Sequence, residues 1–350
     1  MLLLIAAALL LLIIGMKVDV RGQCDSLQKE QTTPIRGVCA LFVILMHLIN
    51  EKDGNSLFVQ LSIGVGYLLV GTFLFYSGYG LMVSYKSKPG YRRTFIKHRI
   101  IPMLLSYLFF NLLYWVAEYL RNGKWYTVTE VISSLFNGSP IVFDSWFILA
   151  LLYQYLAFYL LMWLFPQKQK RILLGSVCFS LIWSGVCILR EFDAYWYNTS
   201  LCLPFGILIG IYKERYVDFT KKHYGACLAV SIFALGIALG GTVVLRALDG
   251  LKILLVAASC VLFITTILLV MMKCKTDNPI WYFLSDISLE LYLFHRLSLR
   301  FFRGPHVYIE NSLLYGLAVV TTSIPAAYLI HLLLSGKIRR MIRNIVEKRK

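Results

Sequence analysis

The sequence predicts an all-α protein: a polytopic transmembrane helical bundle of ten core spans, with one further N-terminal helix left open. Of the 350 residues, 59% are hydrophobic and 15% are charged, whereas an average soluble domain has roughly 45–50% and about 25%. The mean hydropathy is +0.70, and apolar segments near the length of a membrane span, about 20 residues, recur along the chain. These observations exclude a disordered chain, a coiled coil and a nucleic-acid-binding domain with an ordinary core.

Eleven apolar segments are candidate membrane helices. The first covers residues 2–15 and has neither the charged n-region nor the small-residue cleavage site of a signal peptide. It is either a short extra helix with its N-terminus outside or an upstream extension of a chain that starts at Met16. The last segment ends near Leu334. The ten core segments begin near Pro34, Leu57, Ile100, Ser145, Ile172, Trp196, Tyr224, Leu251, Pro279 and Tyr308.

The basic residues set the orientation, because Lys and Arg collect in cytoplasmic loops. If residues 17–36 are cytoplasmic and the chain then alternates, 26 of the 35 Lys and Arg residues lie inside. The net charge of +17 then reflects this bias rather than nucleic-acid binding. We expect an N-terminal hydrophobic segment and cytoplasmic linker over residues 1–31, a membrane domain over 32–336 and a basic cytoplasmic tail over 337–350, in a multi-pass protein of the cell membrane.

The eight cysteines do not indicate a metal or redox site. Six lie in apolar segments and none belongs to a CxxC pair, which argues against a zinc cluster or a disulfide framework. In such segments a free cysteine acts as a small hydrophobic side chain. No metal site is predicted.

Polar groups at membrane depth are costly and mark candidate functional sites. The first core span reads RGVCALFVILMH over residues 36–47. Along a helix, His47 lies about 16 Å above Arg36, and the two side chains fall within about 20° of one face. The pair is either a functional seam, with a cytoplasmic cation below a buried imidazole, or an interfacial anchor and a hydrogen-bonded core histidine.

The second and third core spans add features that suit ligand binding. Residues 77–80 read SGYG, which allows close approach of either a ligand or another helix. Seven basic groups, counting a histidine, then lie within residues 85–102. They fit either a generic cytoplasmic loop or a site for an anionic cofactor, since Arg and Lys bind phosphates. The candidates are Lys97, Arg99, Arg92 and Arg93.

The fourth core span opens with Asp144 and Trp146. They lie at the outer interface, where tryptophan is common in membrane proteins, so this signal is weak by itself. The remaining histidines lie at interfaces or alone and are interpreted as structural: His98, His223, His306 and His331.

The ninth core span reads SDISLELYLFHRL over residues 285–297. Its five polar or charged groups are more than a lipid-facing helix tolerates. Helical periodicity places Ser288, Tyr292 and His295 within about 60° of one another, with Asp286 and Glu290 on the opposite face. The span therefore lines a cavity or belongs to a structural polar network.

Together these segments resemble the membrane acyltransferase 3 family over residues 32–340. The family hallmark is an arginine and a histidine separated by ten residues in the first core helix, matched by Arg36 and His47. The family also has a Phe and Ser-Gly stretch in the second helix, similar to residues 75–80 here. The other motifs are a basic pair before the third helix, a tryptophan opening the fourth and an S…YLxH stretch, matched by Lys97, Arg99, Trp146, Ser288, Tyr292 and His295.

The resemblance implies an enzyme that transfers an acyl group other than an amino-acyl group, often acetyl. The acceptor would be a hydroxyl of an extracytoplasmic carbohydrate or cell-envelope component, as in O-acetylation of polysaccharides. Cytoplasmic acyl-CoA would be the donor substrate, with no permanently bound cofactor. The implied partners are acyl-CoA, a surface or lipid-linked carbohydrate and the bilayer, without nucleic acid. The implied roles are catalysis by His47 and Arg36, donor binding by Arg36, Lys97, Arg99, Arg92 and Arg93, and acceptor binding by Ser288, Tyr292, His295 and Trp146.

The sequence departs from the family pattern at three points. Lys97 stands where an arginine is usual, no glutamate follows Trp146, and no fused esterase-like domain follows the tail. The first departure weakens the inference on the donor, and the other two leave the acceptor open. A transporter or flippase could use the same polar seam, although the two matching broken halves of such proteins are missing. A membrane sensor or scaffold would not need His47 and His295.

Overall fold

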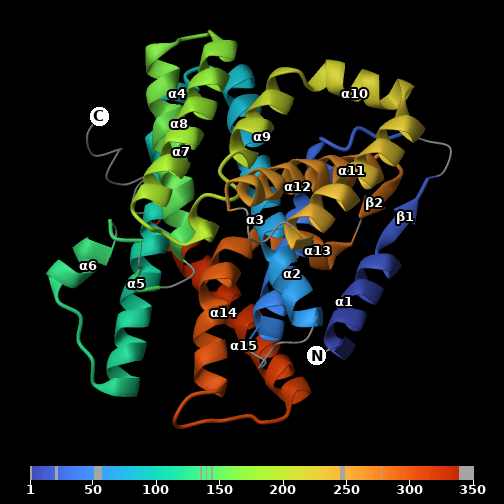
Figure 1. The fold of residues 1–350 in the computed structure, drawn as a ribbon. Helices are drawn as coiled ribbons and strands as arrows, with labels where there is room; N and C mark the ends of the chain where they lie inside the picture. Colours follow the sequence, from blue (N-terminus) through green and yellow to red (C-terminus); the bar gives the residue numbers. More distant parts are fainter. Residues whose placement is uncertain are drawn as a thin grey trace.

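The computed structural model describes residues 2–19, 23–50, 57–134, 136–138, 140–142, 145–244, 249–276 and 278–338. Most of these residues are helical (Figure 1). Within this part of the chain, eight helices are long and apolar enough to cross a membrane. The predicted class, an all-α polytopic helical bundle, is confirmed. Asp144 and the tail after residue 338 lie outside the described residues.

The elements follow one another along the chain with short connections. The N-terminal half contains α1 (Leu2–Ile14), β1 (Met16–Val18), α2 (Lys29–Asn50), α3 (Leu57–Ser87), α4 (Tyr91–Phe95), a π-helical turn (Ile96–Ile100), α5 (Ile101–Asn122), α6 (Val128–Ser134) and α7 (Trp146–Leu164). The C-terminal half contains α8 (Gln169–Leu189), a 3₁₀ turn (Ala194–Trp196), α9 (Cys202–Ile211), α10 (Lys213–Lys222), α11 (Tyr224–Val244), α12 (Asp249–Val270), β2 (Cys274–Thr276), α13 (Pro279–Asp286), α14 (Ser288–Phe302), α15 (Ser312–Leu332) and a second π-helical turn (Leu333–Ile338).

Three predicted segments are not single full spans. The N-terminal segment forms α1, a helix of 13 residues, and the segment predicted to begin near Trp196 forms α9, a helix of 10 residues from Cys202. At 1.5 Å per residue these helices are about 20 Å and about 15 Å long, shorter than the roughly 30 Å hydrocarbon core. The ninth predicted core span is divided at Ile287 into α13 and α14.

The helix α2 starts before the predicted Pro34 and runs through it. Proline has no N–H, so the carbonyl four residues earlier loses its usual donor. That carbonyl belongs to Glu30, and the hydroxyl of Tyr282 on α13 donates to it at 3.0 Å. A side chain from another helix thus replaces the missing bond, and it ties α2 to α13.

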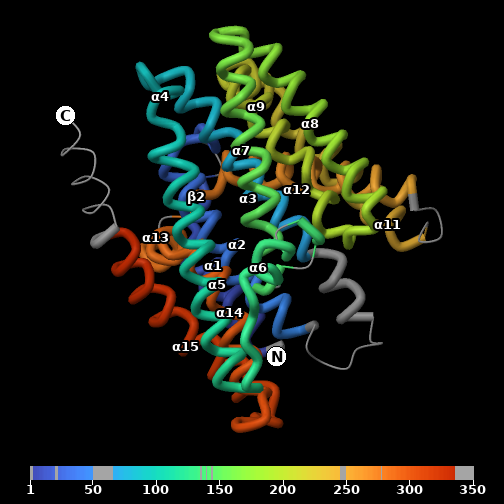
Figure 2. Tube along the Cα trace, turned by 90° about the vertical axis from the view of Figure 1, so that its left-hand side faces the viewer, coloured from blue at the N-terminus to red at the C-terminus, as the bar shows by residue number. Residues whose placement is uncertain are grey.

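The helices α2 and α3 occupy the centre of the molecule (Figures 1 and 2). Glycines allow their partners to approach at backbone distance. A Cβ added at Gly78 of α3 would collide with the carbonyl oxygen of Leu203, and one added at Gly206 of α9 with that of Phe75. Small residues drive such packing in membranes because no hydrophobic effect acts between helices there. Residues 77–80 were expected to allow close approach of either a ligand or another helix, and at Gly78 it is another helix, α9.

Interactions between connecting segments agree with the predicted alternation of the chain. The strand β1 pairs antiparallel with β2, so Lys17 lies opposite Lys275, and both were assigned to the cytoplasmic side. At the other side of the bundle, Arg300 forms an ion pair with Glu118 at 2.9 Å. Figure 1 shows α4 and α10 at the top and the α14–α15 connection at the bottom, which also matches the alternation.

Large apolar side chains cover the outside of several helices. On α11, Val230 and Phe233 are 67% and 72% exposed, and α5 and α8 expose similar residues such as Leu112 and Ile182. In a soluble protein such patches would mark binding sites or aggregation. On helices of this length they form the surface that contacts lipid.

Candidate active site

A large cavity lies between the start of α2, the second half of α3 and the start of α14. It has a volume of about 1260 Å³. The π-helical turn, α5, α7, α10 and the end of α15 complete its wall. Most of the contributing helix ends are those predicted to be cytoplasmic. We call this volume the basic cavity because of the charges that line it.

Five cationic side chains and two carboxylates line the basic cavity. The carboxylates are Glu30 and Glu290, and the cations are Lys29, Arg36, Lys97, Arg99 and Lys213. The formal excess of three positive charges favours an anionic ligand, because like charges in one cavity repel and an anion between them removes the repulsion. Guanidinium and ammonium groups are also the preferred protein ligands of phosphate.

The π-helical turn positions two of these cations, Lys97 and Arg99. Such turns are rare, and they occur frequently at functional sites. The Nε of Arg99 donates to the hydroxyl of Tyr91 at 3.3 Å, and a terminal nitrogen lies 3.5 Å from the Oγ of Ser84. Two hydroxyls thus hold the guanidinium without neutralising its charge. Arg36 of α2 lies close enough to interact electrostatically with Arg99.

Lys213 enters the cavity from α10, outside the spanning helices. Its Nζ lies 2.8 Å from a carboxylate oxygen of Asp25. Burial alone disfavours the ammonium, but the hydrogen bond to Asp25 and the nearby Tyr79 together raise the pKa of Lys213 above its ordinary value. This lysine therefore remains charged at neutral pH.

The cavity is large enough for a ligand of nucleotide size. Its volume of about 1260 Å³ exceeds the range of about 300–1,000 Å³ typical of small-molecule sites. The cations lie near helix ends predicted to be cytoplasmic, whereas Phe147 lies at the start of α7, the end predicted to be on the outer side, and Tyr292 packs against it. Their rings are 5.3 Å apart. This arrangement, with cations at one end and aromatic rings at the other, suits a ligand that carries an anionic group.

Two histidines from different helices lie next to each other, and one of them also lies next to Tyr292. The ring centroids of His47 on α2 and His295 on α14 are 5.0 Å apart, and those of Tyr292 and His295 are 5.9 Å apart. His295 is fully buried, at 0% exposure, whereas His47 is only half-buried. Neither histidine lines the basic cavity itself. Tyr292 is therefore the link between the cavity and the histidine pair.

A second pair, Glu290 and His331, also lines the basic cavity. The Nδ1 of His331 lies 3.3 Å from a carboxylate oxygen of Glu290. Helical periodicity predicts Glu290 on the face opposite Ser288 and Tyr292, and His331 is predicted to be structural, but all four residues line the same cavity. The break at Ile287 changes the environment of this turn. A carboxylate at membrane depth needs a cation or a hydrogen-bond donor nearby. Glu290 in the sequence therefore implied a partner such as His331.

Besides the two histidines, three predicted site residues lie outside the basic cavity. Arg92 donates to the carbonyl of Met162 at 3.4 Å, and its guanidinium lies 4.1 Å from the ring centroid of Trp163. Arg93 is exposed and does not line the cavity. Trp146 packs in an aromatic cluster, with ring centroids 4.9 Å from Tyr195. Ser288, by contrast, lines the cavity at the start of α14.

The comparison with protein families agrees with this arrangement. A family model described as an acyltransferase domain, that of acyltransferase 3, matches residues 35–332. No curated protein and no solved structure gave a significant match. The matched range contains both histidines of the pair and most of the residues that line the basic cavity. The match covers well over half of the chain, which therefore belongs to the acyltransferase 3 family and is a multi-pass membrane acyltransferase.

Proposed function

We propose that this acyltransferase moves an acyl group, in the simplest case acetyl, from cytoplasmic acyl-CoA to a hydroxyl of an extracytoplasmic carbohydrate. One observation carries the proposal. The basic cavity, with Arg36 and Arg99 in its wall, is also lined by Tyr292, whose ring centroid lies 5.9 Å from that of His295. A site for an anionic donor thus lies next to a group able to accept a proton.

Charge and shape support a position for the donor in this proposal. The phosphates of CoA lie against Arg36, Lys97 and Arg99, which donate charge-assisted hydrogen bonds to them. The pantetheine chain extends toward Phe147 and Tyr292. Because His47 is about 16 Å further along α2 than Arg36, the donor reaches the reaction centre only in an extended conformation.

The histidine pair supplies general acid–base catalysis. The imidazole of His47 accepts the proton of the acceptor hydroxyl while the hydroxyl oxygen attacks the thioester carbonyl. The carbon–sulfur bond then breaks, and the CoA thiolate takes the proton from the imidazolium, so the histidine returns to its neutral form. His295, packed against His47 at 5.0 Å between ring centroids, holds the ring in place. Ser288 and Tyr292 remain candidates for contacts with the substrates.

The experiment measures acyl transfer directly. Purified protein in nanodiscs is given isotopically labelled acetyl-CoA and cell-envelope glycans, and the glycans are analysed by mass spectrometry for the mass of one acyl group. We expect His47→Ala to lower the rate by about 10²- to 10⁴-fold, the range for loss of a general acid–base group. His223→Ala, at an exposed histidine of the α10–α11 connection, serves as the matched control.

Two results would overturn the proposal. Near-normal transfer by a well-folded His47→Ala variant would remove the histidine from the chemistry. Movement of an unmodified solute across the bilayer without any acylated product would favour transport instead. Labelled product that appears only with the wild type and the control variant supports acyl transfer.

A further inference from the structure

Three aromatic side chains lie at the deep end of the basic cavity, and we call them the aromatic layer: Phe73 of α3, Phe147 of α7 and Tyr292 of α14. On each of these helices, the aromatic residue is the cavity-lining residue furthest from the predicted cytoplasmic side. In the predicted orientation α3 and α7 run inward and α14 runs outward. Three helices from distant parts of the chain thus stop lining the cavity at an aromatic ring.

The rings of the aromatic layer are in contact with one another. The ring centroids of Phe73 and Phe147 are 6.3 Å apart, and those of Phe147 and Tyr292 are 5.3 Å apart. The ring planes are inclined by 61° and 62°, which is the edge-to-face arrangement that aromatic pairs favour at about 4.5–7 Å. Phe147 and Tyr292 are only 7% and 6% exposed. Because close packing leaves few voids around buried side chains, these two rings cannot move aside without a cost.

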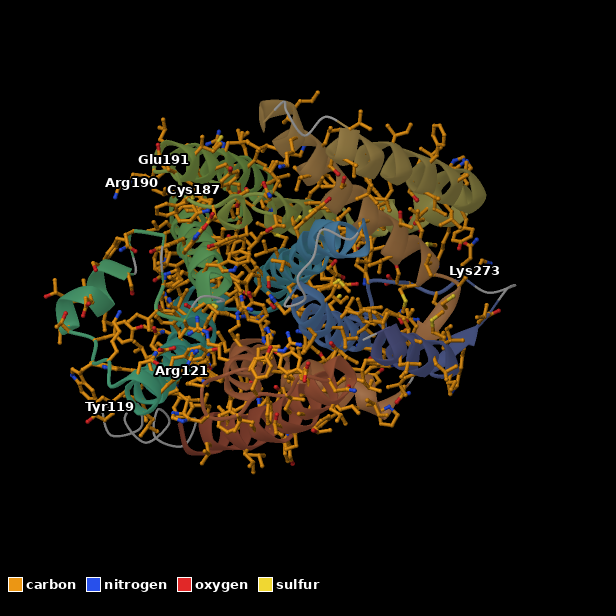
Figure 3. The ribbon with its side chains drawn as sticks, turned by 60° about the horizontal axis from the view of Figure 1, so that its bottom comes forward. Tyr119, Arg121, Cys187, Arg190, Glu191 and Lys273 are labelled. Carbon is orange, nitrogen blue, oxygen red and sulfur yellow. The ribbon has the colours of Figure 1, made fainter. Side chains whose placement is uncertain are left out.

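The histidine pair lies next to the aromatic layer on the side away from the cations. Along α14, His295 is about 4.5 Å further toward the predicted outer side than Tyr292, and the centroids of these two rings are 5.9 Å apart. His47 lies 5.0 Å from His295 between ring centroids, and neither histidine lines the cavity. Figure 3 shows the bundle with its predicted outer end turned toward the viewer, where Arg121 marks the end of α5.

The position of the aromatic layer determines which part of an acyl-CoA would meet it. The phosphates of the donor are attracted to the cations near the cytoplasmic helix ends, such as Arg36 and Arg99. The acyl group is at the opposite end of the donor molecule. For the thioester carbonyl to come close to His47, the acyl group has to lie against the rings of the layer.

A long acyl chain would have to displace these rings, whereas a short one would not. An acetyl group extends beyond the thioester carbonyl by a single methyl group, but a hexanoyl group extends by a whole alkyl chain. Forcing additional methylenes into a close-packed site shifts its side chains and is unfavourable. In an apolar pocket one methylene changes the discrimination between substrates by about 10- to 200-fold. The layer is therefore suited to distinguish acyl groups by length.

We propose that the aromatic layer sets the length of the transferred acyl group, so that Phe73, Phe147 and Tyr292 select acetyl-CoA over donors with longer acyl chains. The inference rests on the proposed function, because it assumes that acyl-CoA binds in the basic cavity and reacts at the histidine pair. Phe147 is the principal determinant of length, because its ring contacts both of the other rings.

The test measures donor binding without an acceptor. Wild-type protein in nanodiscs is titrated by calorimetry with three thioethers of CoA that cannot transfer an acyl group: S-ethyl-CoA, S-butyl-CoA and S-hexyl-CoA. The ethyl group is close to acetyl in size. We expect S-hexyl-CoA to bind at least about ten-fold less tightly than S-ethyl-CoA, with S-butyl-CoA between them, because every added methylene has to fit against the layer.

Two variants connect this discrimination to the layer. Phe147→Ala should strengthen binding of S-hexyl-CoA by about ten-fold or more and change the affinity for S-ethyl-CoA by less than about three-fold, because it opens space only beyond the short chain. Phe158→Ala is the matched control, since Phe158 is a buried phenylalanine of the same helix that does not line the cavity. Thermal unfolding checks both variants. If either is poorly folded, Phe147→Leu and Phe158→Leu replace the pair.

The outcomes separate this inference from the proposed function. Equal affinity of the wild type for S-ethyl-CoA and S-hexyl-CoA would overturn the inference alone, as would equal effects of Phe147→Ala and Phe158→Ala on the ratio of these affinities. The expected dependence on chain length without transfer of acetyl to any glycan would count against the proposed function alone. Failure of the wild type to bind CoA and all three thioethers would contradict both.

Discussion

Replacing Arg99 with alanine should weaken CoA binding by about 10- to 150-fold. The guanidinium lines the basic cavity and is held by the hydroxyls of Tyr91 and Ser84 at 3.3 and 3.5 Å, neither of which neutralises it. Its remaining donors are therefore available to a phosphate. A hydrogen bond to a charged group contributes about 1.5–3 kcal/mol, which corresponds to the stated change in Kd.

Arg99→Lys should lie between the wild type and Arg99→Ala, because lysine keeps the charge but loses the planar, bidentate geometry. Lys88→Ala is the matched control: Lys88 is an exposed lysine of the same connection and does not line the cavity. Binding is measured by calorimetry on protein in nanodiscs, and thermal unfolding checks that each variant is folded.

Pantetheine, which lacks the phosphates of CoA, provides a further control. If Arg99 binds a phosphate, the affinity for pantetheine should be the same in the wild type and in Arg99→Ala. CoA affinity within about two-fold of the wild type in a folded Arg99→Ala variant would refute the reasoning, since that is far below the loss expected for a charged hydrogen bond. Equal losses in Arg99→Ala and Lys88→Ala would indicate only a general effect of positive charge.

Three further predictions follow from the packing and the charge. Gly78→Leu should lower the unfolding temperature by several degrees or prevent folding, because the new side chain would meet the backbone of α9. Gly225→Leu, where the structure leaves open space, should leave the unfolding temperature nearly unchanged. Similar unfolding temperatures for the two variants would contradict the packing argument. Tyr282→Phe should destabilise the protein by about 0.5–1.5 kcal/mol, the net contribution of a typical hydrogen bond, because the bond to the Glu30 carbonyl is exposed. Denaturation measures this change, and an unchanged stability would show that Glu30 finds another donor. Raising the salt concentration from about 0.1 M to about 1 M shortens the Debye length from about 10 Å to about 3 Å, so CoA binding should weaken, and a constant Kd would exclude an electrostatic site.

The class of the protein and the geometry inside single helices follow from the amino-acid sequence alone. Long apolar segments with few charges have no soluble alternative, because only a bilayer accommodates the exposed apolar surface of helices such as α11. The spacing of Arg36 and His47 along α2 follows from the helical rise alone. The alternation of basic segments likewise anticipated which connections meet, as in the pairing of Lys17 with Lys275.

Helix lengths and breaks were predicted less well, since they depend on partners from elsewhere in the chain. Pro34 reads as a helix start, but the hydroxyl of Tyr282, 252 residues away from Glu30, allows α2 to begin earlier. The break between α13 and α14 at Ile287 could not be predicted, because no glycine or proline lies there. The sequence allows Gly78 to contact either a ligand or another helix, and the position of α9 shows that it contacts a helix.

Which polar residues lie together depends on how the helices pack. Periodicity relates residues of one helix, whereas the contact of His47 with His295 depends on how α2 and α14 pack. The same holds for His331, which the sequence leaves isolated and the fold brings to 3.3 Å from Glu290. Within a basic segment of seven groups, packing separates Arg99, which faces the cavity, from Arg92, which binds α7. Hydropathy and local spacing are properties of a segment, but a site is a property of the contacts between segments.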